Sequence, residues 1–428
     1  MRIVKLSEVL KHRKEFIQIS DDQSYKLCRV QTNRKGVLLR EIKIGALIQT
    51  KKQQVCKKGD FIVAEMDAKV GGYGFIPEDL DGSIVSSHYF LFDVDFGKIR
   101  KEYLEAIIQT EIIQEQIKAK GSTNYSAIRP KDVLNWEIPL ATLDEQKEIE
   151  KNFLKIREVS INLLVEIECQ KTLLSQLKQS ILQEAIQGKL TEEWRVLRQS
   201  QQAPLEPASE LLKRIQAEKA KLIKEKKIKK EKPLPPITDS EKPFELPEGW
   251  EWCRFQTISI NRDELRKPIS KRERESKNKL YDYYGASGVI DKIDGFTHDG
   301  KFLLIGEDGS NLRLRSTPVA FEASGKFWVN NHAHSVQFIE EITQKFIRDF
   351  INGIDLTPFI TGGFQPKLSQ GNLNLIPVPF PPLEEQQAIV GKVESLMEKC
   401  RALEEEINQS EQHAQMLMQA VMKEAFER

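Results

Sequence analysis

The chain has 428 residues, of which 39% are hydrophobic and 30% are charged, a balance typical of a folded protein with two or three cores. It has no run near the roughly 18 consecutive apolar residues that cross a bilayer, and Met1 opens without an apolar signal region. We therefore expect a cytoplasmic protein that does not engage a membrane. The five cysteines are scattered and never spaced as C-x-x-C, which argues against a disulfide framework or a cysteine-based zinc site.

Charge is balanced overall but unevenly placed along the chain. There are 65 basic and 64 acidic residues, for a formal net charge of +1. Basic residues gather at 219–232 and 267–279, whereas acidic residues gather at 145–168 and 384–411. This split is compatible with one surface for a polyanion and another for protein partners, although a solvated helix face explains any single run equally well.

The first 140 residues predict a β-rich domain of mixed α and β. Short apolar runs and Gly-rich turns, such as 69–74, favour strands over helices. One helical segment is expected from Tyr103 to Ala119. The segment from 246 to 380 echoes this order, with a second helical segment from Gln344 to Asn352.

A repeated junction follows each of these segments. Residues 138–149 read I-P-L-A-T-L-D-E-Q-K-E-I and residues 378–389 read V-P-F-P-P-L-E-E-Q-Q-A-I, and the offset between the two copies stays constant down to Phe426. A fixed offset of this length indicates a duplicated unit.

Each junction leads into a long helix with apolar residues at alternating steps of four and three, the heptad pattern of paired helices. The predicted helix-pairing residues are Ile149, Phe153, Ile156, Leu163, Ile167, Leu177, Ile389, Val393, Leu396, Leu403, Ile407 and Leu417. A lone helix would expose this stripe to water, so we predict an antiparallel coiled coil related by a pseudo-twofold axis near Val165. The alternative is that each helix packs on its own domain.

The symmetry of the heptads also predicts a register. The expected facing pairs are Leu163 with Ile407, Ile156 with Ala414, Ile149 with Val421, Ser160 with Ser410, and Gln170 with Cys400. Between the two halves, residues 201–245 predict a Lys- and Pro-rich helical linker, in which prolines bracket residues 208–232. Its lysines could contact phosphate, but a solvated spacer is an equal alternative.

The repeated strings resemble the specificity (S) subunit of Type I restriction-modification systems. The resemblance lies in G-S-T-N-Y-S-A-I-R-P-K-D-V-L-N-W-E-I-P-L before the first helix, T-G-G-F-Q-P-K-L-S-Q-G-N-L-N-L-I-P-V-P-F before the second, and L-P-E-G-W-E-W at 246–252. It covers nearly the whole chain and is strongest at the junctions between proline and helix. On this resemblance, 1–140 and 246–380 are target recognition domains, 141–200 and 381–428 are conserved helical regions, and 201–245 is the linker.

The resemblance implies an α+β fold in which two mixed α/β target recognition domains are separated by two long helices, which form an antiparallel coiled coil with a pseudo-twofold internal repeat. It also implies that the chain binds a bipartite, non-palindromic site on double-stranded DNA, docks two methyltransferase (M) subunits through its helices and joins restriction (R) subunits. S-adenosylmethionine and ATP are expected only on those partner subunits.

Two signatures of partner chemistry are missing from the sequence. It contains no Asn or Asp followed by Pro-Pro and an aromatic residue, and no glycine-lysine pair is followed by Ser or Thr as a phosphate-binding loop requires. We therefore predict a non-catalytic subunit without cofactors. The alternative function is a non-enzymatic coiled-coil adaptor that presents two ligand-binding domains.

His332 and His334 share one face of a predicted strand near Glu307 and Asp308, an arrangement that could bind a metal ion. We predict no metal there, because 307–309 is better explained as a strand-ending turn in which the Asp bonds its own backbone. His334 also lacks a counterpart in the first domain, whereas His332 matches His88.

DNA reading requires amide and guanidinium groups for base edges and lysines, hydroxyls and backbone amides for phosphates. The candidates are Lys51, Lys52, Lys69, Tyr73, Ser86, Ser87, Asn124, Tyr125 and Arg129 in the first domain, with Lys57 and Lys58 as further phosphate contacts, and Lys271, Arg272, Asn311, Arg313, Arg315, Asn330, Asn331, Gln365 and Lys367 in the second.

Overall fold

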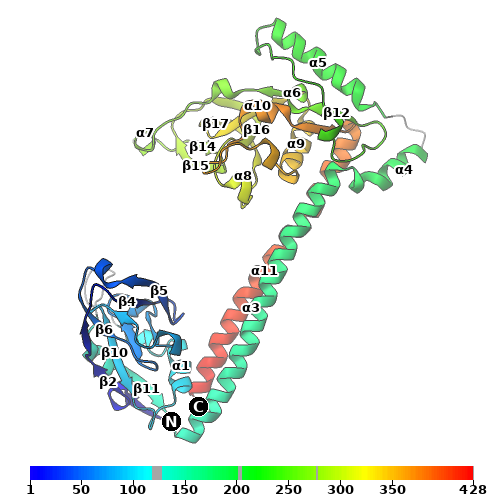
Figure 1. The fold of residues 1–428 in the computed structure, drawn as a ribbon. Helices are drawn as coiled ribbons and strands as arrows, with labels where there is room; N and C mark the ends of the chain where they lie inside the picture. Colours follow the sequence, from blue (N-terminus) through cyan, green and yellow to red (C-terminus); the bar gives the residue numbers. More distant parts are fainter. Residues whose placement is uncertain (118–127, 201–204, 276–277, 428) are drawn as a thin grey trace. The chain divides into compact units, whose positions relative to one another are not determined.

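The computed structural model of the chain describes residues 1–117, 128–200, 205–275 and 278–427. It divides into two compact units, the first made of Met1–Cys169 with Ile407–Arg428 and the second made of Gln170–Glu406 (Figure 1). Each unit thus contains one globular domain and part of each long helix. Within the described ranges, no helix combines the length and the apolar character needed to cross a bilayer.

The first unit contains three antiparallel or mixed sheets. Their strand orders are β1-β11, β2-β10-β7-β8 and β3-β6-β9-β4-β5. The elements are β1 (Arg2–Lys5), β2 (Leu10–Arg13), β3 (Phe16–Gln18), β4 (Ser24–Val30), β5 (Val37–Ile44), β6 (Lys52–Val55), β7 (Phe61–Ala64), β8 (Tyr73–Phe75), β9 (Ile84–Val85), β10 (Tyr89–Val94), α1 (Lys101–Gln109), α2 (Pro130–Leu134), β11 (Glu137–Leu140) and the first part of α3 (Leu143–Ile186).

The core of this unit joins the sheet to the helices. Phe61 and Phe92 from the sheet, Tyr103 from α1, and Phe153 from α3 belong to one buried cluster. The helix predicted from Tyr103 to Ala119 is shorter than expected, because Thr110 ends α1 by bonding its hydroxyl to the Ile107 carbonyl at 2.6 Å. The end of the predicted range, from residue 118, lies outside the described residues.

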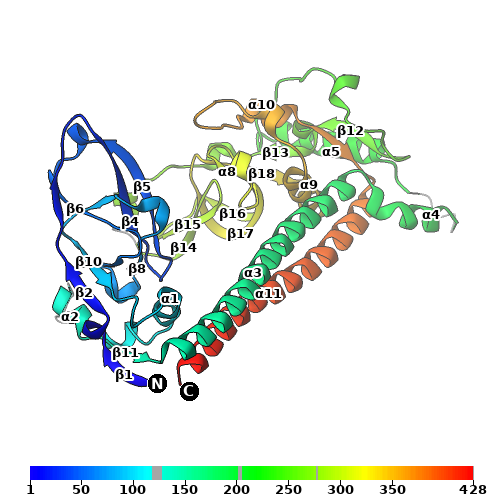
Figure 2. The same ribbon diagram turned by 60° about the horizontal axis from the view of Figure 1, so that its bottom comes forward.

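The second unit contains a two-stranded sheet, β12-β19, and a six-stranded sheet, β13-β18-β16-β17-β14-β15 (Figure 2). Its elements are α4 (Glu192–Ser200), α5 (Ala208–Lys224), β12 (Glu251–Arg254), α6 (Phe255–Ile258), β13 (Ser259–Asn261), α7 (Lys271–Glu275), β14 (Tyr281–Gly285), β15 (Gly288–Ile293), β16 (His298–Gly306), α8 (Asn311–Leu314), β17 (Ala320–Val329), β18 (Ala333–Phe338), α9 (Glu341–Gly353), α10 (Gln370–Leu375), β19 (Pro377–Phe380) and the first part of α11 (Leu383–Glu427).

The linker helix α5 packs on the second domain instead of acting as a solvated spacer. Leu211 and Ile215 are buried, and the Lys219 ammonium donates to the carbonyls of Gln256 and Ser259 at 2.6 and 2.7 Å. Lys219 also pairs with Glu231 at 2.8 Å. A buried lysine that is paired and hydrogen-bonded stabilises this docking, so Lys219 is not available to phosphate.

The two domains share one framework. The strand order β2-β10-β7-β8 of the first is matched by β13-β18-β16-β17 in the second. The short sheets agree residue by residue, since Arg2 pairs with Leu140 as Glu251 pairs with Phe380. The predicted α+β class, with two mixed domains, an internal repeat and two long helices, is therefore confirmed.

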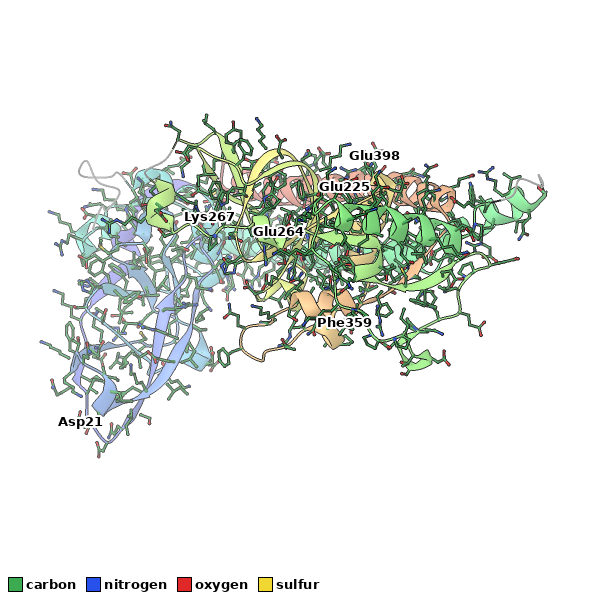
Figure 3. All side chains as sticks on the ribbon, turned by 90° about the horizontal axis from the view of Figure 1, so that it is seen from above. Asp21, Glu225, Glu264, Lys267, Phe359 and Glu398 are labelled. Carbon is green, nitrogen blue, oxygen red and sulfur yellow. The ribbon has the colours of Figure 1, made fainter. Side chains whose placement is uncertain are left out.

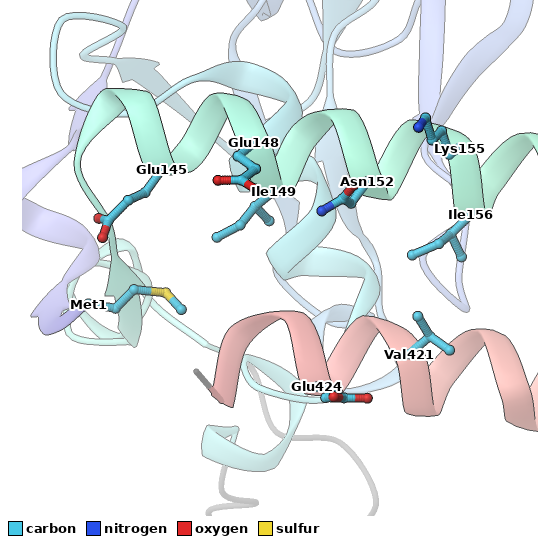
Figure 4. Close-up of a pocket in the computed structure, with 9 residues that line it drawn as sticks. All are labelled: Met1, Glu145, Glu148, Ile149, Asn152, Lys155, Ile156, Val421 and Glu424. Carbon is cyan, nitrogen blue, oxygen red and sulfur yellow. The ribbon is translucent and has the colours of Figure 1, made fainter.

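The helices run antiparallel within each unit. In the first unit, Ile156 near the start of α3 lies opposite Val421 near the end of α11 (Figure 4). In the second, Lys178 of α3 pairs with Glu404 at 2.8 Å, and Thr191, just after α3, bonds Glu385 at 2.8 Å. Partner numbers fall as α3 numbers rise, which confirms the predicted direction.

The predicted heptads are only partly buried. Phe153, Ile167, Ile389 and Val393 are buried, and Ile149, Ile156, Leu396 and Ile407 are half-buried. The prediction is wrong for Leu163, Leu177, Leu403 and Leu417, which are 40%, 46%, 45% and 63% exposed. Two paired helices enclose each other only along a narrow line, so apolar residues at its rim, such as Leu163 and Leu403, stay partly exposed.

The predicted register is also wrong at the points that the structure resolves. Ile156, and not Ile149, points at Val421 (Figure 4). Ser160 bonds the Ile156 carbonyl of its own helix at 2.8 Å, and Ser410 is exposed, so these two do not form the expected polar layer. A heptad pattern repeats every seven residues and cannot fix register alone; here Phe426 is held against Tyr103, with ring centroids 5.6 Å apart.

Candidate nucleic-acid interface

A buried carboxylate organises one edge of the second domain. Glu307 directly follows β16; its N–H donates to the His332 carbonyl at 2.8 Å, and its own carbonyl accepts from the Leu368 N–H at 2.7 Å. Its side chain accepts from Arg266 at 2.5 Å and pairs with Lys367 at 3.1 Å. Glu307 thus fixes the turn before β18, the loop before α10 and the loop after β13.

The charges behind this edge compensate one another. Arg266 also pairs with Asp263 at 3.0 Å, and Asp263 bonds His334 Nδ1 at 2.7 Å. Burial opposes ionisation of Asp263 and Glu307, but the hydrogen bonds and charges of Arg266 and His334 outweigh burial and hold the pKa of both carboxyls below their ordinary values. A paired, hydrogen-bonded cluster of this kind makes the edge rigid.

The histidines weighed as metal ligands are engaged in this network. His334 is buried, and its Nε2 faces the Leu368 carbonyl at 2.8 Å while its Nδ1 faces Asp263, so both ring nitrogens have protein partners. His332 Nδ1 bonds the Asp308 carboxylate at 2.9 Å. The prediction that the Asp308 side chain bonds its own backbone is therefore wrong: it bonds the imidazole ring of His332. No cluster of three or more potential ligands suited to a metal occurs among the described residues.

A closed loop projects from this edge. Thr361 and Lys367 exchange two backbone hydrogen bonds of 2.8 Å, and the Arg313 guanidinium donates to the carbonyls of Gly363 and Gly362 at 3.2 and 3.1 Å. Phe364, at the tip, has a relative exposure of 109%. The ring of Phe364 is therefore accessible to another molecule, on a loop whose backbone is held by hydrogen bonds.

Six of the nine candidates of the second domain are exposed, four at this edge and two on α7. Asn331 follows β17, Arg313 and Lys367 brace the loop, and Gln365 lies at its tip. Arg272 lies on α7 with Lys271, whose side chain is 84% exposed.

The side chains of the other three candidates bond within the domain and do not face a ligand. Asn330 is buried, and its side-chain oxygen accepts from the His332 N–H at 2.8 Å. The Asn311 amide is used by Ser316 and Thr317, at 3.0 Å each. Short polar side chains that follow a strand satisfy local backbone groups before they can reach a ligand.

Arg315 is the third. It adopts a left-handed backbone with φ of 50° and donates to the carbonyls of Asn352 and Ile351 at 3.0 and 3.4 Å. These are unpaired carbonyls at the end of α9, where a cation is favoured. Burial lowers the pKa of Arg315, in keeping with a side chain turned inward.

The first domain repeats the edge around Glu65. This residue follows β7; its N–H donates to the His88 carbonyl at 2.9 Å, and its carbonyl accepts from Ile128 at 3.2 Å. Its carboxylate bonds His88 Nδ1 at 2.7 Å and Arg129 at 3.2 Å. Glu65, His88 and Ile128 therefore hold the places of Glu307, His332 and Leu368, but the ionic partners differ.

Ser86, Ser87 and Arg129 gather at this first edge, with Arg129 73% exposed. The prediction is wrong for Tyr73, which does not lie at this edge. Tyr73 is fully buried, and burial raises the pKa of its hydroxyl to about 12. Its position beside Gly72 and Gly74 suggested a surface loop, but β8 carries it into the core. Asn124 and Tyr125 lie outside the described residues.

The lysines predicted for the first domain lie at several separate places. Lys51 pairs at 2.5 Å with Asp21, which lies at the tip of the blue strands (Figure 3), and Lys52 lies 4.8 Å from the Phe16 ring centre. Lys57 and Lys58 pair with Glu15 and Glu78 at 2.7 and 2.9 Å. Lys69 is exposed beside the Gly71 turn. These lysines do not form one basic patch with the Glu65 edge.

Sequence reasoning missed Glu65, Arg266 and Phe364. The match of His88 with His332 was a usable signal for Glu65, because an acidic residue precedes both histidines at similar separation in the two copies. Phe364 carried no such signal, since a phenylalanine between glycines and a glutamine reads equally well as core.

Comparison with known proteins agrees with this repeated architecture. The pattern of the family described as "Type I restriction modification DNA specificity domain" matches residues 1–168 and 247–410. The type I restriction enzyme EcoEI specificity subunit of Escherichia coli is 30% identical over 303 residues, which are 64% of this chain and 49% of that protein. The EcoAI specificity subunit of Escherichia coli is 35% identical over 252 residues, 53% of this chain and 40% of that protein.

The chain thus spans about half the length of the curated relatives that it matches. A solved chain, described as the structural basis underlying complex assembly and conformational transition of the type I R-M system, has a TM-score of 0.67 and 17% identity and covers 99% of this chain and 97% of its own length. That likeness shows a shared fold. The two matched segments make up most of the chain, and the protein belongs to the type I restriction-modification DNA specificity family.

Proposed function

We propose that the chain is the DNA-recognition subunit of a type I restriction-modification complex. Each domain would read one half of a split, non-palindromic duplex site through the edge organised by Glu65 or Glu307. The chain would not catalyse a reaction itself; two methyltransferase subunits and restriction subunits would supply the chemistry, together with S-adenosylmethionine and ATP.

The observation that carries this proposal is that the two domains share the same backbone hydrogen bonds at one edge but present different side chains there. Glu65 and Glu307 make the same pair of backbone bonds, to His88 and Ile128 in one domain and to His332 and Leu368 in the other. Around that frame the first edge presents Ser87 and Arg129, while the second presents a loop with Phe364 and Gln365. Different side chains on equivalent frames suit two different half-sites.

The groups on both rims have the chemistry of a duplex reader. Arg and Gln side chains can make paired hydrogen bonds with base edges, and an exposed Phe can enter between base steps. Elsewhere on the two domains, the exposed lysines Lys69 and Lys271 have the charge to contact phosphates.

The long helices support docking of partner proteins. Leu154, Ile161 and Val165 share one face of α3 at spacings of seven and four, and they are 44%, 50% and 64% exposed. Apolar residues gathered on one exposed helix are typical of a protein interaction site.

The test is selection of binding sites from randomised duplex DNA, followed by titration of the selected duplex at several salt concentrations. We expect one split sequence, bound with a steep negative slope of log K against log salt. Selection of no sequence, with binding insensitive to salt, would instead favour the adaptor function.

A further inference from the structure

A carboxylate at the start of α11 is enclosed by three donors in the second unit. Glu385 is 1% exposed and accepts from Thr191 Oγ at 2.8 Å, Arg195 at 2.5 Å and Trp250 Nε1 at 2.8 Å. Thr191 and Arg195 lie on the segment that follows α3, and the neighbouring Glu384 pairs with Arg198 of the same segment. The segment that follows α3 thus covers the start of this helix with a hydroxyl and two arginines.

The duplicated position at the start of α3 is open. Glu145 corresponds to Glu385 in the repeat, yet it is exposed; among the described residues its carboxylate accepts from the backbone and hydroxyl of Thr142, at 2.9 Å each. These bonds and, more weakly, the N-terminal ammonium lower the pKa of Glu145, but no side-chain cation bonds it within the described ranges. Asp144 and Glu148 make no ion pair with any residue in the described ranges. Met1 precedes β1 where Trp250 precedes β12, so the indole donor is also replaced.

A cavity of about 540 Å³ lies at this open position in the first unit (Figure 4). Its carboxylates are Glu145, Glu148 and Glu424, and Ile149, Ile156 and Val421 form an apolar floor between the helices. Lys155 and Asn152 lie on the α3 side, and the Met1 side chain reaches the entrance beside Glu145.

We infer that this cavity, around Glu145, docks a segment of a partner protein that presents an arginine beside apolar residues. The occupant would repeat on the first unit what residues 188–198 do on the second, with its guanidinium on Glu145 and its apolar residues on Ile149, Ile156 and Val421. The inference rests on the proposed assembly with partner subunits and names the place and chemistry of one contact.

Charge and packing favour this occupant. The three carboxylates outnumber Lys155 and the N-terminal ammonium, so the cavity favours a cationic, amphipathic segment over an anionic ligand such as DNA. An arginine can bond a carboxylate with two parallel N–H groups, as no lysine can. A second copy of this chain is a poorer candidate, because its matching arginine, Arg195, is already bonded to its own Glu385.

The test uses a synthetic peptide with the sequence of residues 187–200, titrated by calorimetry into the full chain. We expect saturable binding that weakens about tenfold with the Glu145→Gln variant and also when the peptide carries alanine in place of Arg195. Glu158→Gln, an exposed change on the same helix outside the cavity, is the matched control and should bind the peptide as the original chain does.

Absence of binding up to about 1 mM peptide, or binding unaffected by Glu145→Gln, would overturn the inference. If sedimentation shows that the chain self-associates and Glu145→Gln abolishes it, the occupant is a second copy and the partner-protein inference is wrong. Duplex binding by the same preparations separates this inference from the proposed function, since either can fail while the other holds.

Discussion

The two globular domains share a skeleton and differ in what they attach to it. Glu65 and Glu307 occupy the same place and make the same backbone bonds, but Glu65 pairs with exposed His88 and Arg129, whereas Glu307 pairs with Arg266 and Lys367 and lies over the buried Asp263–His334 pair. The comparison teaches that duplication preserved backbone geometry, while the ionic partners and the rim diverged.

The starts of the two long helices differ in the same way. Glu385 is enclosed, while Glu145 caps its own helix in contact with solvent. The same local sequence, E-Q in both copies, should therefore contribute differently to the free energy of unfolding at the two places.

The largest expected effect comes from Glu385→Ala. Removing this carboxylate leaves Arg195 and the Trp250 indole N–H without their acceptor, which should lower the free energy of unfolding by about 3–5 kcal/mol. Glu145→Ala, the matched change, removes an exposed helix-capping interaction and should lower stability much less. Denaturant unfolding of both full-length variants measures the two costs; equal costs would contradict the comparison.

Acid should destabilise the second domain through His298, and burial together with Lys14 also lowers the pKa of His12 in the first domain. His298 stacks on Phe327 with ring centroids 5.1 Å apart, and burial lowers the pKa of its ring from 6.5 to about 4. The unfolded chain therefore binds a proton more readily than the folded one, so stability is constant above pH 6.5 and falls between 6.5 and about 4, by about 3 kcal/mol at most.

His298→Phe should flatten that fall, as followed by thermal unfolding across this pH range. His413→Phe, on an exposed position of α11, serves as control and should leave the acid sensitivity in place. A His298→Phe variant as acid-sensitive as the original chain would show that the destabilisation arises elsewhere.

Glu307→Gln should disturb one half-site more than the other. The amide cannot neutralise both Arg266 and Lys367, so the loop from Thr361 to Lys367 loses its anchor, and affinity for the selected duplex should fall about tenfold. Glu65→Gln is the matched variant, and its loss should fall on the other half. Duplexes with one half-site scrambled distinguish the two; parallel behaviour of both variants would break the comparison.

The smallest effect is expected at the start of α10. Ser369 caps this helix by accepting from the Asn372 N–H at 3.2 Å, whereas Arg129 takes the equivalent place before α2 and relies on Asp132. Ser369→Ala should lower stability by about 1 kcal/mol. Thermal unfolding checks this, with Ser324→Ala on an exposed position of β17 as control.

Much of the architecture could be predicted because the sequence of one half repeats in the other. The junction at Pro139 and Pro379, the long helices and their antiparallel direction follow from periodicity. The register of the two helices and the burial of their apolar residues could not be predicted from periodicity. The heptad pattern does not distinguish enclosed apolar residues from those at the rim, such as Leu163 and Leu417, which are 40% and 63% exposed.

The candidate site was predicted less well, for a different reason. Residue type suggests what a side chain can bind but not which way it points. Arg315 turns inward to the end of α9, and Tyr73 lies in the core, because neighbouring backbone groups and strand direction decide orientation. The best surface residue, Phe364, is of a type that usually lies inside.

The most direct test of the central claim is methylation mapping in cells that carry this chain with its methyltransferase partner, compared with a Phe364→Ala, Gln365→Ala double variant. Separate reading by the two domains predicts one split motif for the original chain, and for the variant a change confined to one half of that motif. An unsplit motif, or a variant in which both halves change together, would contradict the account.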